Sequence, residues 1–540
     1  MPRDISVEEL KRLRESGERH ALFDVRERGE YNRKQLPNAT PLPRGLLELR
    51  APVLMPVRDI PAVVLCDDGR RSALAAETLA AMGYRDVRVV TGGLDAWEAA
   101  GYPIQEGVGV PGKDYGEMIS VVKAIPQITP EELVERQRAD EKFVIMDSRT
   151  VDEYRRAHLP GAYSVPGGEL PATVGDLVPD DQMTIVVNCA GRTRSILGAD
   201  ILMRLGLPNR IYAFKNGTMA WDMAGFELER GEGRGRPTPS AQGRERAERF
   251  AAQIAEREGL PATSVAELQR LPRSGELYYV VDVRLPEEYE RGHIPGAVSA
   301  PGGQLVLTSE DTIAVPDATI VLTCDARARA TVGALLYKEM GFPNVSFLDG
   351  GTAAWVAAGL PLETGRPLPE IAGLDAARAQ TRTLQPAELK AKLDGGAGVA
   401  IVDVRGSGDY ALGHVAGSSW IPRGRLELRV GEVVPDRSTP VVTVCDSGIR
   451  STLAAGTLRA HGYEDVAVLD GGIDAWRAAG LPLEEGLRGA DVTIDHAKGD
   501  IESFRRAGVL ERNRQDMEYY LSWEEALGHK YESSGAGGHG

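Results

Sequence analysis

The apolar run Ala62-Val63-Val64-Leu65-Cys66 leads directly into the polar loop Asp67-Asp68-Gly69-Arg70-Arg71, and this junction decides the fold. A continuous β-branched and aliphatic run is typical of a strand that is buried on both faces, as in a parallel sheet. After the loop, apolar residues recur at helical spacing until Gly83, where glycine is the expected left-handed helix end. The segment therefore predicts a strand, a tight turn and a helix in succession.

The same junction occurs four times and contains every cysteine of the chain. Each cysteine stands 42 residues after the aspartate of an Asp-x-Arg triplet and is followed at the fifth position by an arginine. An acidic residue and a tyrosine follow each triplet, and a tryptophan closes each copy. Such self-similarity indicates tandem copies of one unit. The cysteines are Cys66, Cys189, Cys324 and Cys445, and the arginines are Arg71, Arg194, Arg329 and Arg450.

A chain of 540 residues is too long for one hydrophobic core, and strands alternate with helices in every copy. This pattern predicts an α/β fold of four tandem small doubly wound domains, each with a parallel central sheet. We expect the domains at residues 1–110, 111–232, 263–368 and 369–487.

Two segments fall outside the predicted domains. Residues 233–262 begin rich in Gly, Pro and Arg, then carry a charged helix over 244–258, and we expect this linker to separate two halves of two domains each. The tail, 488–540, has predicted helical stretches at 500–507 and 522–527 and a small-residue end, 533–540, that is expected to be disordered.

The four copies are of two kinds. The first and fourth share Pro-Arg-Gly-x-Leu-Glu-Leu-Arg, at 43–50 and 422–429. The second and third share Pro-Gly-Ala-x-Ser-x-Pro-Gly-Gly, at 160–168 and 295–303. The order along the chain is therefore outer, inner, inner, outer.

The composition of the chain limits the kinds of partner that it can bind. The 63 Lys and Arg against 79 Asp and Glu give a net charge of −16, which argues against nucleic acid or an anionic membrane surface as partner. No apolar run is long enough to span a bilayer. The N-terminus begins with an amphipathic helix pattern and no apolar signal core, so we expect a cytoplasmic protein. One cysteine per repeat fits neither a disulfide framework nor a zinc site, and we expect no metal.

The chemistry expected of the loop comes from the helix that follows it. The first N–H groups of a helix have no helical partner, and together with the helix dipole they form an anion cradle. A cysteine there should have a lowered pKa and more of the reactive thiolate. Gly69, Gly191 and Gly448 would allow a turn with positive φ. A cysteine at a strand end is more often a buried structural residue, but four in one frame favour a function.

The loops differ in formal charge. The second loop carries Arg192 and Arg194 without an acid, the third sums to +1, and the first and fourth sum to zero. We therefore expect Cys189 to have the lowest thiol pKa and Arg192 to help bind an anionic donor. The third loop lacks the glycine, and the first copy lacks a His-x-Pro-Gly-Ala segment, so a mainly structural role is equally compatible with those two domains.

These motifs resemble the rhodanese superfamily, over about four fifths of the chain. The matching features are the Asp-x-Arg triplet, the acidic-Tyr pair, the segment His293–Ala297, the Cys-x-x-x-x-Arg loop and the tryptophan. The resemblance implies a sulfurtransferase whose cysteine takes a sulfane sulfur from thiosulfate or a similar donor. The resulting persulfide passes the sulfur to cyanide, a thiol or another thiophilic acceptor, including a protein. No metal or organic cofactor is implied.

The expected site follows residue by residue. The four cysteines are the nucleophiles, and the fifth-position arginines, with Arg192, are the substrate-binding groups. The Asp-x-Arg triplets are expected to form supporting ion pairs beneath the loop: Asp24 with Arg26, Asp147 with Arg149, Asp282 with Arg284, and Asp403 with Arg405. One alternative is a persulfide carrier or interaction scaffold with little small-molecule turnover. A weaker alternative is a Cys-based phosphatase or arsenate reductase, whose loops have five residues between Cys and Arg instead of four.

Overall fold

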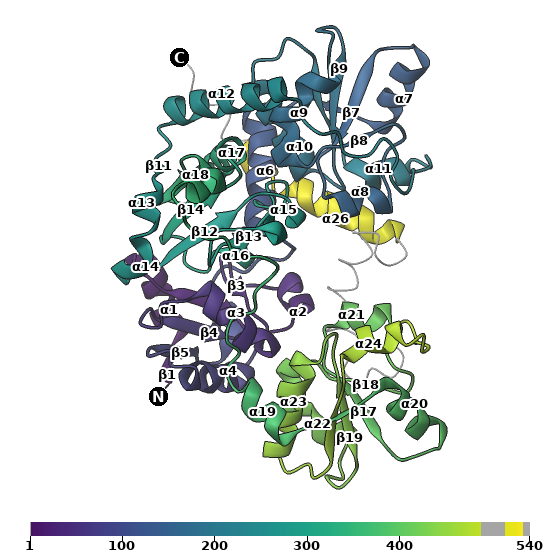
Figure 1. The fold of residues 1–540 in the computed structure, drawn as a ribbon. Helices are drawn as coiled ribbons and strands as arrows, with labels where there is room; N and C mark the ends of the chain where they lie inside the picture. Colours follow the sequence, from purple (N-terminus) through teal and green to yellow (C-terminus); the bar gives the residue numbers. More distant parts are fainter. Residues whose placement is uncertain (1, 488–512, 533–540) are drawn as a thin grey trace. The chain divides into compact units, whose positions relative to one another are not determined.

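The computed structural model describes residues 2–487 and 513–532. Their strands form four separate five-stranded sheets, all with parallel pairing and with one shared strand order (Figure 1). The orders are β1-β5-β4-β2-β3, β6-β10-β9-β7-β8, β11-β15-β14-β12-β13 and β16-β20-β19-β17-β18. Helices flank each sheet, so the predicted fold of four tandem parallel α/β domains is confirmed.

The two outer domains have matching elements. The first contains β1 (Arg3–Ile5), α1 (Val7–Ser16), β2 (Ala21–Asp24), α2 (Arg28–Arg33), β3 (Thr40–Pro41), η1 (Arg44–Leu46), α3 (Leu47–Leu54), β4 (Ala62–Leu65), α4 (Arg70–Ala81), β5 (Val87–Val90) and α5 (Gly93–Ala99). The fourth contains α19 (Leu374–Gln380), β16 (Arg382–Leu384), α20 (Pro386–Asp394), β17 (Ala400–Asp403), α21 (Ser407–Leu412), β18 (Ser419–Trp420), η3 (Arg423–Arg425), α22 (Leu426–Val433), β19 (Val441–Val444), α23 (Ile449–Ala460), β20 (Val466–Leu469) and α24 (Gly472–Ala478).

The inner domains follow the same plan with added helices. The second contains α6 (Val110–Val122), β6 (Gln127–Ile128), α7 (Pro130–Arg138), β7 (Phe143–Asp147), α8 (Val151–Arg156), β8 (Tyr163–Ser164), η2 (Gly167–Glu169), α9 (Leu170–Leu177), β9 (Thr184–Asn188), α10 (Thr193–Arg204), β10 (Ile211–Phe214) and α11 (Gly217–Met223). The third contains β11 (Ala262–Thr263), α13 (Val265–Leu268), α14 (Leu271–Ser274), β12 (Tyr278–Asp282), α15 (Pro286–Arg291), β13 (Val298–Ser299), α16 (Ser309–Thr312), β14 (Thr319–Thr323), α17 (Ala328–Glu339), β15 (Val345–Leu348) and α18 (Gly351–Ala357).

The remaining helices belong to the linker and the tail. The linker helix α12 spans Ala241–Glu258, close to the predicted 244–258, and the tail contributes α26 (Arg514–Ala526) and α27 (His529–Glu532). The predicted stretch at 522–527 falls largely within α26. The predicted helix at 500–507 and the predicted disorder at 533–540 lie outside the described residues. Within the described part of the chain, no helix is both long and apolar enough to cross a membrane.

The four domains associate as outer with outer and inner with inner. Of the described residues, 2–108 and 368–487 form one compact unit, and 109–367 and 513–532 form the other. The expectation that the linker separates two sequential halves is therefore wrong. Instead, α12 packs between α9 and α17 in the second unit and buries Phe250, Ala251 and Ile254. Among its many charged residues, α12 carries an apolar face that packs against both inner domains.

The motifs shared within each pair form the contacts between its domains. In the outer pair, η1 packs on η3, and two reciprocal ion pairs join the domains: Arg44 with Glu427 at 2.5 Å and Arg423 with Glu48 at 2.6 Å. In the inner pair the glycines allow the backbones to meet, because a Cβ on Gly303 would lie 3.1 Å from the nitrogen of Gly167. Within each pair, the motif of one domain therefore contacts the same motif of its partner.

We predict that Glu427→Gln lowers the free energy of unfolding by about 2 kcal/mol, because it removes the counter-charge of a half-buried arginine. Both side chains of the Arg44–Glu427 pair are only 11% exposed. The measurement is chemical denaturation of the full chain. Glu432→Gln is the matched control, because this glutamate is 59% exposed and pairs with Arg429 on the surface. Equal stability of the two variants would contradict the prediction.

Candidate active site

Sheet register brings the triplet and the cysteine loop together. β4 lies between β2 and β5, and Asp24 at the end of β2 pairs in register with Leu65 at the end of β4. The carboxyl ends of parallel strands meet at one edge, which is where ligands bind in open α/β sheets. The corresponding register pairs Asp403 with Val444 in the fourth domain. The fixed spacing of 42 residues therefore reflects neighbouring strands that end side by side.

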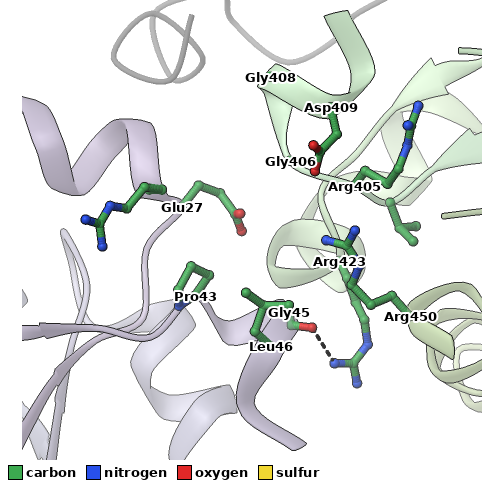
Figure 2. A pocket seen from close by; sticks show the side chains of 12 residues that line it. Glu27, Pro43, Gly45, Leu46, Arg405, Gly406, Gly408, Asp409, Arg423 and Arg450 are labelled. Carbon is green, nitrogen blue, oxygen red and sulfur yellow. Dashed lines mark hydrogen bonds between the residues drawn. The ribbon is translucent and has the colours of Figure 1, made fainter. Parts of the chain in front are cut away.

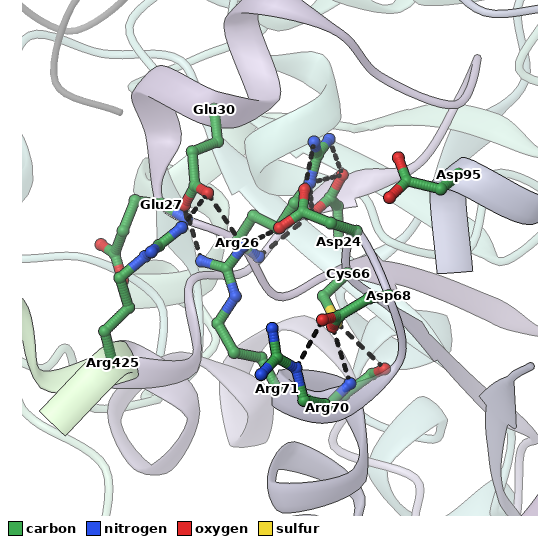
Figure 3. Close-up of polar contacts among 12 residues, drawn as sticks. Asp24, Arg26, Glu27, Glu30, Cys66, Asp68, Arg70, Arg71, Asp95 and Arg425 are labelled. Carbon is green, nitrogen blue, oxygen red and sulfur yellow. Dashed lines mark hydrogen bonds and ion pairs between the residues drawn. The ribbon is translucent and has the colours of Figure 1, made fainter. Parts of the chain in front are cut away.

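The predicted ion pairs beneath the loops are confirmed in all four domains. Figure 3 shows the first, where Arg26 donates to both carboxylate oxygens of Asp24 and to the backbone oxygen of Lys34. The aspartate side chains are 0% exposed, so each guanidinium replaces the water that its carboxylate loses. The arginine thereby fastens the chain after the triplet against the sheet edge that carries the cysteine.

The outer loops surround their sulfur with hydrogen-bond donors. Gly69 and Gly448 adopt φ values of 94° and 97°, and each N–H donates to the cysteine Sγ three residues earlier at 3.2 Å. At Cys445 the N–H of Ser451 also donates, at 3.3 Å, and its hydroxyl lies 3.2 Å from Sγ. Glycine is required at the third loop position because only it takes this conformation without strain. One amide therefore donates to the sulfur in the first loop and two do so in the fourth.

The inner loops carry arginine at the third position, and their turn is different. Arg192 and Arg327 have φ values of −125° and −140° and occupy the N-cap positions of α10 and α17. Gly191, one position earlier, does not take the left-handed conformation that we expected of it. With arginine at the third position, the inner loops therefore lack the left-handed turn that glycine makes in the outer loops.

Burial raises the pKa of both inner thiols. Desolvation raises the pKa of Cys189 above its usual value, and this outweighs the charge of Arg194 and the hydrogen bond with Ser195. Desolvation, followed by the charge of Asp325, raises the pKa of Cys324 to about 12. All four thiols are at most 2% exposed, so burial alone does not separate the domains.

The charge that was expected to lower the pKa of Cys189 is engaged elsewhere, because Arg192 points away from the sulfur toward two glutamates. Its guanidinium bonds to Glu117 of α6 at 2.6 and 2.8 Å and to Glu525 of α26 at 2.8 Å. The second loop therefore presents no free charge of +2 to a donor. Both acids come from outside the repeated unit, so no comparison of loop charges could reveal them.

Three of the fifth-position arginines are held by the acidic residue that follows the Asp-x-Arg triplet. The bidentate pairs are Arg71 with Glu30, Arg194 with Glu153, and Arg329 with Glu288. Burial would raise the pKa of Glu30, but hydrogen bonds and charge from Arg71 overcome this and hold it at about 2. These arginines are therefore bound to carboxylates in the structure, and a substrate anion would have to share them.

The fourth domain departs from this arrangement by one methylene group. Its acidic residue is Asp409, which forms no ion pair with Arg450 among the described residues, and Arg450 bonds to Asp446 instead. The Arg450 side chain is 18% exposed, against 4%, 10% and 12% for its equivalents. Figure 2 shows Asp409 and Arg450 lining a pocket of about 220 Å³ whose other residues include Gly45 and Leu46 of the first domain.

A bound metal ion needs several donor side chains that lie close together. Among residues 2–487 and 513–532, no cluster of three or more His, Cys, Asp or Glu side chains could hold a metal ion.

Known proteins contain the same unit and, in one case, the same array. A family model described as a rhodanese-like domain matches residues 6–100, 129–224, 264–358 and 385–479. The crystal structure of a thiosulfate sulfurtransferase from Pseudomonas aeruginosa is 32% identical, covers 98% of this chain and 98% of its own, and superposes with a TM-score of 0.86.

Curated relatives match over shorter stretches. Human 3-mercaptopyruvate sulfurtransferase is 27% identical over 276 residues, which are 40% of this chain and 91% of that protein. The thiosulfate sulfurtransferase GlpE of Shewanella oneidensis is 40% identical over 81 residues, 15% of this chain and 78% of that protein. The match to the Mycobacterium tuberculosis protein named "Probable adenylyltransferase/sulfurtransferase MoeZ", 33% identical over 103 residues, spans 19% of this chain and about a quarter (26%) of that protein.

We predict that the Glu30–Arg71 pair makes the protein sensitive to acid. The folded-state pKa of Glu30 is lowered, so the stability it contributes is complete above the unfolded value of about 4.3 and is lost as pH falls toward 2. The loss is about 3 kcal/mol. Unfolding free energy measured across this window should fall less steeply for Glu30→Gln, which cannot titrate. Glu98→Gln is a surface control, because Glu98 pairs with Lys34, and its unfolding free energy should fall with pH as steeply as that of the parent protein. If Glu30→Gln also kept the parent slope, Glu30 would not be the source of the acid sensitivity.

Proposed function

Because the chain belongs to the rhodanese-like domain family, we propose that it is a sulfurtransferase that uses thiosulfate as donor and a cysteine persulfide as intermediate. The observation that supports this most is the glycine N–H directed at the cysteine sulfur in the first and fourth loops. Backbone donors fixed around a sulfur stabilise its negative charge without reorganisation. Similarity to a thiosulfate sulfurtransferase along nearly the whole chain supports the choice of donor.

The proposed reaction has two displacements. The cysteine thiolate attacks the outer sulfur of thiosulfate, the S–S bond breaks, and sulfite leaves with the bonding electron pair. The cysteine is then a persulfide, whose terminal sulfur carries the negative charge. In the second step a thiophile such as cyanide attacks that terminal sulfur, forms thiocyanate, and returns the electron pair to the cysteine as thiolate. A small thiol or a protein thiol is an equivalent acceptor in this proposal.

Cys445 is the principal nucleophile in this proposal. Its sulfur accepts hydrogen bonds from the N–H groups of Gly448 and Ser451, which suit both the thiolate and the persulfide. Arg450 supplies the positive group for the departing sulfite, since its described ion pair is with Asp446 of its own loop and not with Asp409, and it lines a pocket of the outer unit. Cys66 accepts a bond from the N–H of Gly69 alone, and Arg71 is held by Glu30 and Asp67, so we assign it a slower reaction.

The inner cysteines take a structural part in this proposal. The raised pKa of Cys189 and of Cys324 leaves little thiolate at neutral pH. A carrier or scaffold without small-molecule turnover is the competing proposal, and the same experiment separates the two. Location in the cytoplasm stays a prediction.

We predict that Cys445→Ser lowers thiosulfate–cyanide turnover by about 100-fold or more, because serine cannot carry the sulfur. Cys66→Ser should cost less, and Cys189→Ser and Cys324→Ser should leave turnover near the parent value. Intact mass after thiosulfate treatment should show one added sulfur at Cys445. A chain that gains sulfur but turns over poorly would favour the carrier, and a chain that gains none would refute the sulfurtransferase.

We predict that Asp409→Glu slows turnover by about tenfold, because the longer side chain can form the bidentate bridge that holds the other loop arginines. The change should raise KM for thiosulfate more than it lowers kcat, since Arg450 would be withdrawn from the anion. Asp474→Glu, an exposed acid of α24 beside Arg477, is the control for an added methylene in the same domain. Unchanged KM in Asp409→Glu would contradict the role of Arg450.

A further inference from the structure

The tail helix α26 lies directly on the loop that follows Cys189. A Cβ added to Gly191 would lie 3.3 Å from Glu524 Oε2 and 3.3 Å from a ring carbon of Tyr520. Leu521 and Met517 of the helix pack with Met219 in a small apolar cluster that also contacts Ala190. The helix therefore lies against the loop backbone itself.

Glu524 places a carboxylate at the start of α10. Its Oε1 accepts the Thr193 hydroxyl hydrogen at 2.6 Å and the Thr193 N–H at 3.3 Å. Thr193 is the first residue of a twelve-residue helix, where unpaired N–H groups and the helix dipole favour an anion. Glu524 is 1% exposed, and its Oε2 has no hydrogen-bond partner among the described residues. A buried carboxylate with one unsatisfied oxygen is costly unless the anion site itself attracts it.

Neighbouring charges fix the helix in this position. Glu525 accepts from Arg192 at 2.8 Å, and Arg192 is itself held by Glu117. Lys113 of α6 lies 4.4 Å from the centre of the Tyr520 ring, and Lys530 pairs with Asp114 at 2.7 Å. These contacts are spread along α26 and α27, so several independent interactions hold the two helices in place.

The third domain repeats the arrangement with a different helix. Glu248 of α12 accepts from the N–H groups of Arg327 and Ala328, at 3.3 and 3.0 Å, at the start of α17. In both inner domains a helix outside the repeated unit therefore supplies a carboxylate to N–H groups at the start of the helix that follows the cysteine loop. Glutamates from two unrelated helices bind the equivalent starts of α10 and α17, which indicates that this position binds anions.

We propose that the start of α10 is an anion-binding site whose ligand is the Glu524 carboxylate, and that α26 thereby excludes small anions from Cys189. Glu524 occupies the position that an anionic substrate or reagent would need in order to reach the thiol. The inference does not depend on sulfur transfer, because it concerns access of any anion to this cysteine.

The test uses the full chain with Cys66, Cys324 and Cys445 replaced by serine, so that Cys189 is the single thiol. Its alkylation rate is measured with iodoacetate, which is anionic, and with iodoacetamide, which is neutral and of similar size. Glu524→Gln should raise the iodoacetate rate by about tenfold or more, and should raise the ratio of the two rates, because the competing charge is gone.

Glu518→Gln is the matched control, since Glu518 lies on the same helix, is 54% exposed, and pairs with Arg514. It should leave both rates at the parent values. Glu524→Ala is the second variant and should raise the ratio as Glu524→Gln does. An unchanged ratio in both Glu524 variants, or rates that rise equally for both reagents, would overturn the proposal, because steric cover or unfolding affects the two reagents alike.

Discussion

One hydrogen bond separates the two kinds of domain: the N–H of the third loop residue directed at the cysteine sulfur. It forms where that residue is Gly69 or Gly448, because glycine alone turns the peptide to positive φ at no cost. Where the residue is Arg192 or Arg327, the backbone keeps negative φ and starts the helix differently. The fold is the same in all four copies, and this position decides whether the third amide of the loop reaches the sulfur.

The same choice explains why the inner loops receive carboxylates from outside. A helix start whose N–H groups are not used by its own loop still carries positive potential, and a nearby acid can satisfy it. Glu524 and Glu248 do so in the second and third domains. Each of these two helix starts thus binds a carboxylate that fastens an added helix, while other amides of the inner loops still donate to the cysteine sulfur.

The sheets could be predicted from the sequence because their signals are local. Buried strand patterns, the recurring 42-residue spacing and the final glycines fixed the order of elements, and the Asp-x-Arg ion pairs followed from two residues that are almost adjacent. The partners of Arg192 could not be predicted, because Glu117 and Glu525 lie 75 and 333 positions away. The shared motifs divide the four copies into the two pairs that the structure forms. A shared motif does not by itself indicate, however, that the copies carrying it bind each other.

The outer pair shows how a domain interface can set the state of a loop arginine. Arg425 of η3 extends to Glu30 in the first domain, on the carboxylate that also holds Arg71 (Figure 3). The equivalent position of η1 is Leu46, which cannot hold an acid and lines the same pocket as the shorter acid Asp409 (Figure 2). One domain therefore gains a positive group that neutralises its acid, while the other gains an apolar wall and space beside Arg450. Two substitutions in otherwise matching motifs are enough to change how the loop arginine is held, so duplicated domains that share an interface need not share an activity.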